Sequence, residues 1–447
     1  MLTVSSSAPP HGDQERPQRD CRFLAVGPDV ESSVRATAEQ VIAGQEPSAG
    51  DDGDFQVFDD PVAGDARDPY PELALARAAH PVQRLEMSNM PHDQAHPVFF
   101  VYRYDDILDV LRDGERFSSG HIIELIMGEV MGRYILVGMD NPGHRRYRAL
   151  VSTAFRRSAQ ARWEAELIEP VASELIDRFA GRGRAELVGE FTFPYPTKVT
   201  AGLLGLPGED YQQFQRWSTA ILNVHSRREQ AIAASAQVQD YLAGILSERR
   251  RAPRQDLISD LAHAELDGER LTAEEIFSFV RLLLPAGVET TYRSTGNLLY
   301  CLLSRPGQLD AVRADRSLIP QAIEEALRFE APLLNGTRLA VRDTVLSGVP
   351  IPAGSTLVLM LGAANRDQAR WPDPDRFDIF RDPKVHISFG QGPHICLGMH
   401  LARAEMRVAL NLLLDRLPDL RLDPDGDDPH IRGQVFRSPT SLPVLFG

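Results

Sequence analysis

The chain has 447 residues, of which 43% are hydrophobic and 25% are charged, the balance of an ordinary globular protein. Its formal net charge of −15 disfavours a general nucleic-acid binder, which would present a basic surface. No run of about 18 apolar residues occurs, and the N-terminus lacks a signal-peptide pattern. We therefore expect a cytoplasmic protein that binds neither nucleic acid nor membrane.

Residues 1–65 are rich in Ser, Pro, Gly, Gln and charged side chains, which predicts a flexible N-terminal extension. Helical patterns dominate from about residue 70 onward. Residues 66–447 are therefore expected to form the functional domain.

The first helix with informative side chains is predicted to open at Asn141 and Pro142, residues favoured at a helix start. It places His144 and Arg148 one turn apart on the same face. Such a pair is by itself common on charged helix faces.

A long helix is predicted from Thr272 to about Pro306, because Thr272 and Glu275 form a capping box before a mostly apolar run. Residues 286–291 in its middle read AGVETT. Pro285 lacks a helical N–H, and a threonine hydroxyl can bond back to a carbonyl one turn earlier. We expect a kink there that opens space for a small ligand.

Glu325 and Arg328 lie three residues apart on the next predicted helix, so the two charges share a face and can pair. Residues 345–361 then predict strands around a Pro-Ala-Gly turn. A loop rich in Pro, Asp and Arg follows over residues 365–393. The predicted fold class is mainly α with a minor β region.

The three cysteines are Cys21, Cys301 and Cys396, and their odd number and wide spacing indicate neither a disulfide framework nor a paired-cysteine zinc site. Residues 389–398 read FGQGPHICLG, and a helix is predicted from Leu397 to Leu414. Glycines permit close approach and positive φ, and a helix N-terminus offers unpaired N–H groups. We expect this setting to hold Cys396 as a metal-binding thiolate. The alternative is a buried structural cysteine in a tight turn.

The pattern Phe-x-x-Gly-x-x-x-Cys-x-Gly, with the motifs above, resembles the bacterial soluble type of cytochrome P450 from about residue 65 to the end. The resemblance implies the P450 fold and haem b, with iron bound by Cys396. It also implies further cofactor-binding residues: His144, Arg148, Ala286, Gly287, Arg338, Phe389, Gly390, His394 and Gly398.

The same resemblance assigns catalysis to Thr290, which would steady bound oxygen and water, and to Glu289, which would relay protons. Glu325, Arg328 and Arg376 are implied as a buried network that braces the cysteine loop. The resemblance also implies a set of residues that line the substrate pocket, although any of them could instead belong to the core. They are Ile122, Ile123, Ile126, Met127, Leu283, Leu333, Leu334, Val435 and Phe436.

The implied reaction inserts one oxygen atom from O2 into a C–H or C=C bond of an apolar small molecule such as a terpenoid, steroid or polyketide. The sequence has no flavin or nicotinamide fingerprint, so electrons are expected from a separate ferredoxin and ferredoxin reductase, and a monomer is expected. The docking patch would include Arg145, Arg146, Arg403 and Arg407, although ordinary solvated arginines are an equal reading. Alternatives on the same fold are a non-catalytic haem-binding protein, a peroxide-driven haem enzyme and a reductase of a small nitrogen oxide.

Overall fold

The structure is a computed structural model that describes residues 67–85, 97–121, 128–222, 227–426 and 428–447. The predicted extension and the pocket candidates Ile122, Ile123, Ile126 and Met127 lie outside the described residues. The helices are α2 (Tyr70–Ala79), α3 (Tyr104–Arg112), α4 (Gly128–Met131), α5 (Gly143–Ser152), α6 (Arg157–Trp163), α7 (Glu169–Asp177), α8 (Pro194–Leu203), α9 (Tyr211–Leu222), α10 (Arg228–Arg251), α11 (Leu257–His263), α12 (Ala273–Leu303), α13 (Pro306–Ala314), α14 (Ile319–Phe329), α15 (Leu361–Asn365) and α16 (Met399–Arg416).

The strands are short and form one five-stranded sheet and several smaller ones. The large sheet has the order β1-β2-β10-β7-β3, in which β10 runs parallel to β2 and antiparallel to β7. The bounds are β1 (Val82–Leu85), β2 (Val98–Val101), β3 (Phe117–Ser118), β4 (Arg184–Glu186), β5 (Glu265–Leu266), β6 (Glu269–Arg270), β7 (Gly336–Ala340), β8 (Thr344–Leu346), β9 (Val349–Ile351), β10 (Thr356–Leu359), β11 (Arg421–Leu422), β12 (Ile431–Arg432), β13 (Ser438–Pro439) and β14 (Pro443–Leu445). The mainly α fold class with a minor β region is confirmed.

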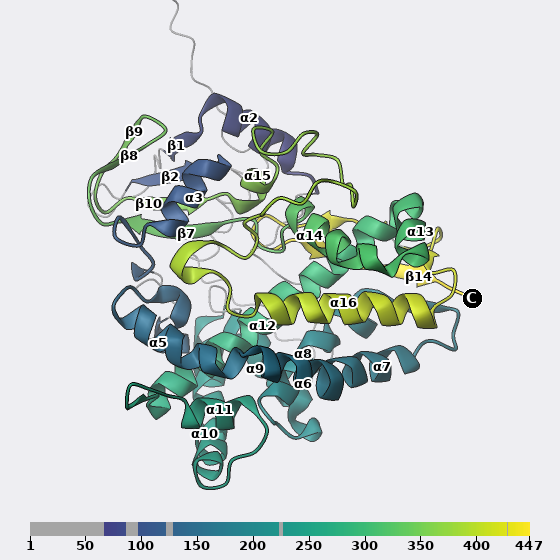
Figure 1. The fold of residues 1–447 in the computed structure, drawn as a ribbon, viewed down its shortest axis with the longest axis horizontal. Helices are drawn as coiled ribbons and strands as arrows, with labels where there is room; N and C mark the ends of the chain where they lie inside the picture. Colours follow the sequence, from purple (N-terminus) through teal and green to yellow (C-terminus); the bar gives the residue numbers. More distant parts are fainter. Residues whose placement is uncertain (1–66, 86–96, 122–127, 223–226, 427) are drawn as a thin grey trace, which may run out of the picture.

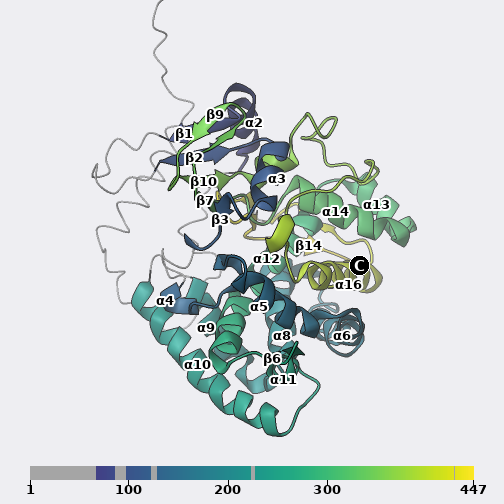
Figure 2. The same cartoon turned by 60° about the vertical axis from the view of Figure 1, so that its left-hand side comes forward.

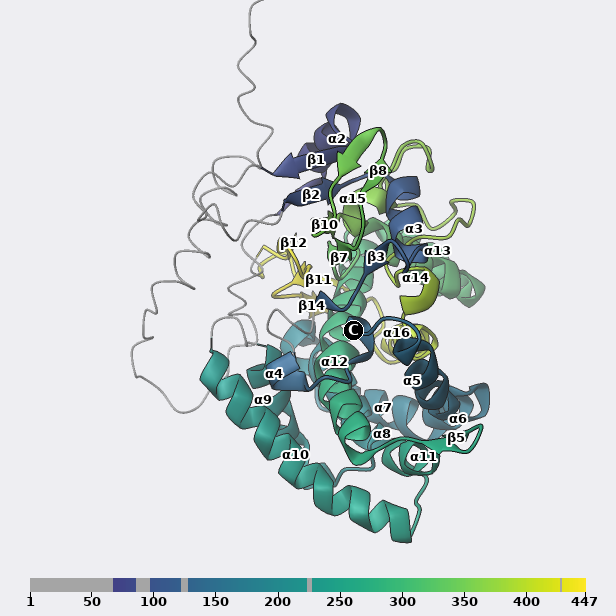
Figure 3. The ribbon, with the colours of Figure 1, turned by 90° about the vertical axis from the view of Figure 1, so that its left-hand side faces the viewer.

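Helix α12 forms the centre of the molecule. The predicted capping box is present, because Thr272 accepts from the Glu275 N–H and the Glu275 carboxylate accepts from the Thr272 N–H. The helix continues through Pro285 without a break, and most of its residues are buried. It packs against α8, α14 and α16, and it lies between α4 and α9 on one side and α5 and α16 on the other (Figure 3).

The five-stranded sheet lies at one end of the molecule beside α2, α3 and α15, and the remaining helices form the larger part (Figure 1). Each part has its own apolar core, one built on α12 and its neighbours and one between the sheet and α3. Helix α10 packs against α9 and α11 along the outer edge (Figure 2). The cysteine loop therefore enters α16 where the two parts meet (Figure 1).

Candidate functional site

The loop before α16 has a backbone that requires glycine at two positions. Gly390 and Gly392 have φ of 67° and 73°, in the left-handed region. A Cβ at Gly392 would also lie 2.4 Å from the carbonyl oxygen of Leu111 at the end of α3. The N–H of Cys396 donates to the carbonyl of Phe389 at 2.8 Å. The loop is thus a closed turn with Cys396 at its exit.

The thiol of Cys396 is exposed, yet burial by the surrounding protein raises its pKa above the ordinary value. Cys396 thus keeps accessible surface although the protein around it removes much of its contact with bulk water. The N–H of Gly398 and the charges of Arg148 and Arg403 oppose the rise without cancelling it. Desolvation outweighs these stabilising groups in the chain by itself, and the expectation that Cys396 binds metal as a thiolate stays a prediction. A bound cation would reverse this balance.

Four basic side chains predicted as cofactor ligands come together beside this loop. The rings of His144 on α5 and His394 lie 4.0 Å apart between centroids. Arg148 donates to the Ile395 carbonyl at 2.6 Å, and Arg338 lies on β7. Burial, followed by the charges of His144 and Arg338, lowers the pKa of His394 to about 3.

Burial also lowers the pKa values of the other three side chains, His144, Arg148 and Arg338. For Arg338 it lowers the pKa to about 10. Among the described residues, Asp140 is the one carboxyl group that opposes these shifts in His144, Arg338 and His394, and the Ser119 N–H already donates to it at 2.9 Å. Nε2 of His144 is buried with no partner among the described residues. This cluster is suited to a ligand that carries two carboxylates.

The middle of α12 exposes a short stretch within an otherwise buried helix. Ala286 is exposed between buried Pro285 and half-buried Gly287. The hydroxyl of Thr290 donates to the carbonyl of Ala286 at 3.0 Å, the back-bonded geometry expected from the sequence. Gly287 instead faces α8, where an added Cβ would lie 3.1 Å from Oγ1 of Thr200. The missing side chain of Gly287 therefore permits close packing of α12 on α8, and its assignment as a cofactor-binding residue stays a prediction.

Glu289 is only 8% exposed, as expected for an acid in the apolar middle of this helix. Its Oε1 accepts from Nε of Arg293 at 2.7 Å and from the hydroxyl of Tyr292 at 3.2 Å. Nη2 of Arg293 contacts the same oxygen. Sequence reasoning missed both partners, although the four-residue spacing of Glu289 and Arg293 is a visible signal for a helical ion pair.

The Glu325–Arg328 pair is buried, with Nε of Arg328 2.7 Å from Oε2 of Glu325. The third member is Arg381, whose Nε lies 3.4 Å from Oε1 of Glu325 and whose side chain is 9% exposed. The assignment of this position to Arg376 is wrong, because its side chain is 69% exposed and reaches Asp378 instead. Only the carbonyl of Arg376 joins the network, where it accepts from Arg328 and Arg381.

Pocket candidates from two distant segments lie side by side. Leu333 and Phe436 form a β-bridge, and the Leu334 N–H donates to the Val435 carbonyl at 2.7 Å. The side chain of Leu334 is buried in the small core beside α2 and α15, so its assignment to the pocket is wrong. Leu283 is partly buried and packs against the main core.

Three of the four arginines considered for partner docking have carboxylate partners. Arg146 pairs with Glu269 and Glu275, Arg403 with Glu324, and Arg407 with Glu164. Arg145 is exposed and has no carboxylate within ion-pair distance among the described residues. It lines an open groove of about 500 Å³ beside the cysteine loop, together with His144, Arg148, Ser152, Gly392 and Pro393.

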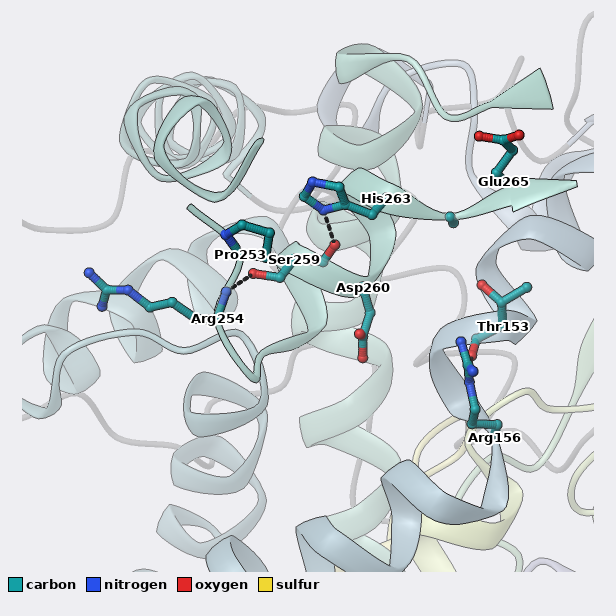
Figure 4. A pocket seen from close by; sticks show the side chains of 9 residues that line it. Thr153, Arg156, Pro253, Arg254, Ser259, Asp260, His263 and Glu265 are labelled. Carbon is teal, nitrogen blue, oxygen red and sulfur yellow. Dashed lines mark hydrogen bonds between the residues drawn. The ribbon is translucent and has the colours of Figure 1, made fainter. Parts of the chain in front are cut away.

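A second hollow of about 490 Å³ lies between α11 and the turn after α5. Figure 4 shows Asp260 and Arg156 facing it, while His263 and Arg254 are tied to Ser259. None of the predicted site residues that the structure describes lines this hollow. In the described ranges, no three His, Cys, Asp or Glu side chains gather as a metal site, and no helix is long and apolar enough to cross a membrane.

The cytochrome P450 family model matches residues 206–445. The chain is 37% identical to cytochrome P450 107B1 of Saccharopolyspora erythraea over 90% of this chain and 100% of that protein. It is 38% identical to the mycinamicin IV hydroxylase/epoxidase of Micromonospora griseorubida, over 84% and 96%. The solved structure of the Bacillus subtilis bacillaene polyketide synthase cytochrome P450 PksS superposes with a TM-score of 0.78 at 33% identity, over 85% and 97%.

The chain belongs to the cytochrome P450 family, so it is a monooxygenase with a haem-iron cofactor. The residues present fit such a group. The basic cluster, in which a His144 nitrogen finds no partner in the described part of the chain, suits the two propionates of haem, and exposed Cys396 and Ala286 offer a thiol and an uncovered helix face.

Proposed function

We propose that this chain is a haem-thiolate monooxygenase in which Cys396 binds the iron of haem b. The observation that carries the proposal is an exposed thiol, on a glycine-dependent turn, beside four basic groups for which Asp140 is the one nearby carboxylate among the described residues. His144, Arg148, Arg338 and His394 would hold the propionates, and Phe389, Gly390 and Gly398 would shape the turn around the sulfur. When bound, haem with a thiolate ligand supplies the activation of dioxygen.

The net reaction is R–H + O2 + two electrons + two protons → R–OH + H2O. Thr290 would steady bound oxygen and water through its hydroxyl, and its bond to Ala286 supports that orientation. Glu289 would pass the two protons inward. Replacing Thr290 with Ala should therefore lower the product formed per reductant consumed and release peroxide instead.

The substrate is proposed to be an apolar small molecule of the polyketide kind, with terpenoids and steroids as further possibilities. The names of the mycinamicin and PksS relatives support this class, and so does the apolar character of Leu333, Val435 and Phe436. Oxygen would enter a C–H or C=C bond. Screening such compounds for the low-spin to high-spin shift of the haem tests the class.

A separate ferredoxin, reduced by its own reductase, is proposed as the electron donor. The groove beside the cysteine loop, where Arg145 is exposed without an ion pair among the described residues, supports docking of an acidic partner. A monomer is proposed as the working state.

The test of the central proposal is the carbon monoxide difference spectrum of the reduced protein. A strongly red-shifted Soret band is expected, and Cys396→His should abolish it. Cys301→Ala is the matched control, because Cys301 is fully buried in α12 and burial raises its pKa to about 12. A Cys396→His protein that keeps the band would overturn the assignment.

A further inference from the structure

The carboxylate of Glu289 is anchored on one side only. The hydroxyl of Tyr292 and the guanidinium of Arg293 both donate to Oε1. Among the described residues no donor reaches the other oxygen, Oε2. A carboxylate held this way has a fixed orientation and one oxygen left to accept and return a proton.

Arg293 also reaches away from α12. Its Nη1 donates to Oγ of Ser438 on β13 at 3.1 Å. Its guanidinium carbon lies 5.3 Å from the ring centroid of Phe436 and 4.9 Å from that of Tyr292. The whole residue is 5% exposed, so these contacts are made away from water, where they are strong.

The segment contacted by Arg293 is attached to α12 at neighbouring positions too. Nδ2 of Asn297 donates to the Arg437 carbonyl at 3.0 Å, and a Cβ on Gly296 would lie 3.4 Å from Pro439. Residues 435–438 therefore keep a fixed position relative to α12. This segment includes Val435 and Phe436, which we assign to the substrate pocket.

We propose that Arg293 is a positioning residue that orients Glu289 for proton transfer and links that carboxylate to the pocket segment 435–438. The inference rests on the proposed role of Glu289 as the proton relay. A planar guanidinium can bond Glu289 and Ser438 at once, whereas a lysine ammonium offers no such fork. Arg293 thereby makes the orientation of the acid depend on how the pocket segment is packed.

The first test compares Arg293→Gln with Arg293→Lys in the haem-loaded enzyme with its redox partners. Product formed per reductant consumed should fall by about tenfold or more in Arg293→Gln, and Arg293→Lys should recover part of it. Substrate affinity, from the spin-state titration, should change by less than about threefold, because the acid rather than the ligand loses its support.

Turnover with hydrogen peroxide separates proton handling from general damage. That reaction, R–H + H2O2 → R–OH + H2O, needs neither electrons nor protons from the relay. It should stay within about twofold of wild type in Arg293→Gln. Equal losses with peroxide and with O2 would overturn the proposal.

Arg281→Gln is the matched control, because Arg281 is a second arginine of α12 that is 5% exposed and bonds Glu274 instead. Both Gln variants should lower the free energy of unfolding, but only Arg293→Gln should uncouple. Similar uncoupling in both would overturn the proposal.

Glu289→Gln separates the proposed proton-relay role of Glu289 from the proposed positioning role of Arg293. If Glu289→Gln loses O2-driven turnover while Arg293→Gln retains it, the relay holds and the positioning role fails. If Glu289→Gln keeps full turnover, the relay itself fails. The double variant should lose no more than about twofold beyond Glu289→Gln, since both changes remove one function.

Discussion

Arg381 shows how a single side chain in an irregular loop can secure a buried carboxylate. Besides its contact with Glu325, it donates to the carbonyls of Asp373 and Arg376 at 2.9 and 2.8 Å. It therefore joins the loop before the cysteine turn to α14. Removing Arg381 would take a cation from the buried carboxylate of Glu325 and a donor from these loop carbonyls.

We expect Arg381→Ala to lower the free energy of unfolding by about 2–4 kcal/mol, because a buried carboxylate loses one of its two cations and three loop carbonyls, those of Pro372, Asp373 and Arg376, lose a donor. Arg376→Ala should change it by less than about 0.5 kcal/mol, since that side chain is exposed. Urea unfolding of the two variants compares them. Equal destabilisation by both substitutions would show that the Arg376 side chain belongs to the buried network with Glu325 and Arg328.

Glu405 on α16 gives a pH prediction. Burial raises the pKa of this carboxyl well above its ordinary value, and its Oε2 has no partner among the described residues. Above the unfolded pKa, the folded state keeps a proton that the unfolded state has released. The contribution of Glu405 to stability therefore falls as pH rises, by up to about 1.4 kcal/mol per pH unit.

Glu405→Met removes this proton uptake at a similar side-chain volume. Relative to wild type, the variant should gain stability as pH rises from about 5 to 7, which denaturant unfolding at both values would measure. A constant difference between the two proteins would mean that Glu405 ionises in the folded state.

At the scale of elements, the cysteine turn depends on backbone shape more than on side-chain contacts. Gly392→Ala should destabilise the fold by about 2 kcal/mol or more, because it combines a positive φ with a Cβ against the end of α3. Gly398→Ala is the control, since Gly398 has φ of −84° and no atom of the described residues lies within 4 Å of the added Cβ. Thermal unfolding distinguishes them, and equal midpoints would contradict this account.

The long helix shows what sequence could and could not predict. The capping box, the apolar run and the spacing of Cys396 before a helix follow from local chemistry, and they gave α12 and α16 to within a few residues. Whether Gly287 faces another helix depends on where α8 packs, and no local sequence pattern specifies that. Arg376 and Arg381 both lie in one irregular loop. Side chains in such a loop follow no regular period, so the sequence could not tell which arginine points toward Glu325.

At the scale of the whole molecule, the pairing of strands from distant segments could not be predicted from the sequence. The parallel pairing of β2 with β10 joins residues about 260 positions apart, and the bridge from Leu333 to Phe436 spans about 100. These pairings place the pocket candidates, so apolar character alone could not separate Leu334 in the core from Phe436 beside Arg293.

Charge distribution gives the last prediction. The chain carries a net charge of −15, so an acidic ferredoxin would be repelled by the molecule as a whole and attracted only locally. Arg145, in the groove beside the cysteine loop, supplies such local attraction. Arg145→Glu should slow reduction by ferredoxin about tenfold at low salt, with a smaller effect at high salt because ions screen the contact.

Arg250→Glu is the matched control, because Arg250 is exposed near the end of α10, which lies along the outer edge away from the cysteine loop (Figure 2). It changes the net charge by the same amount, so any effect of overall charge appears equally in both variants. Stopped-flow reduction at several salt concentrations measures the two rates. If ferredoxin docks at this groove, only Arg145→Glu should show both a lower reduction rate and a weaker salt dependence. Equal reduction rates in the two variants would show that overall charge, and not this groove, governs the encounter.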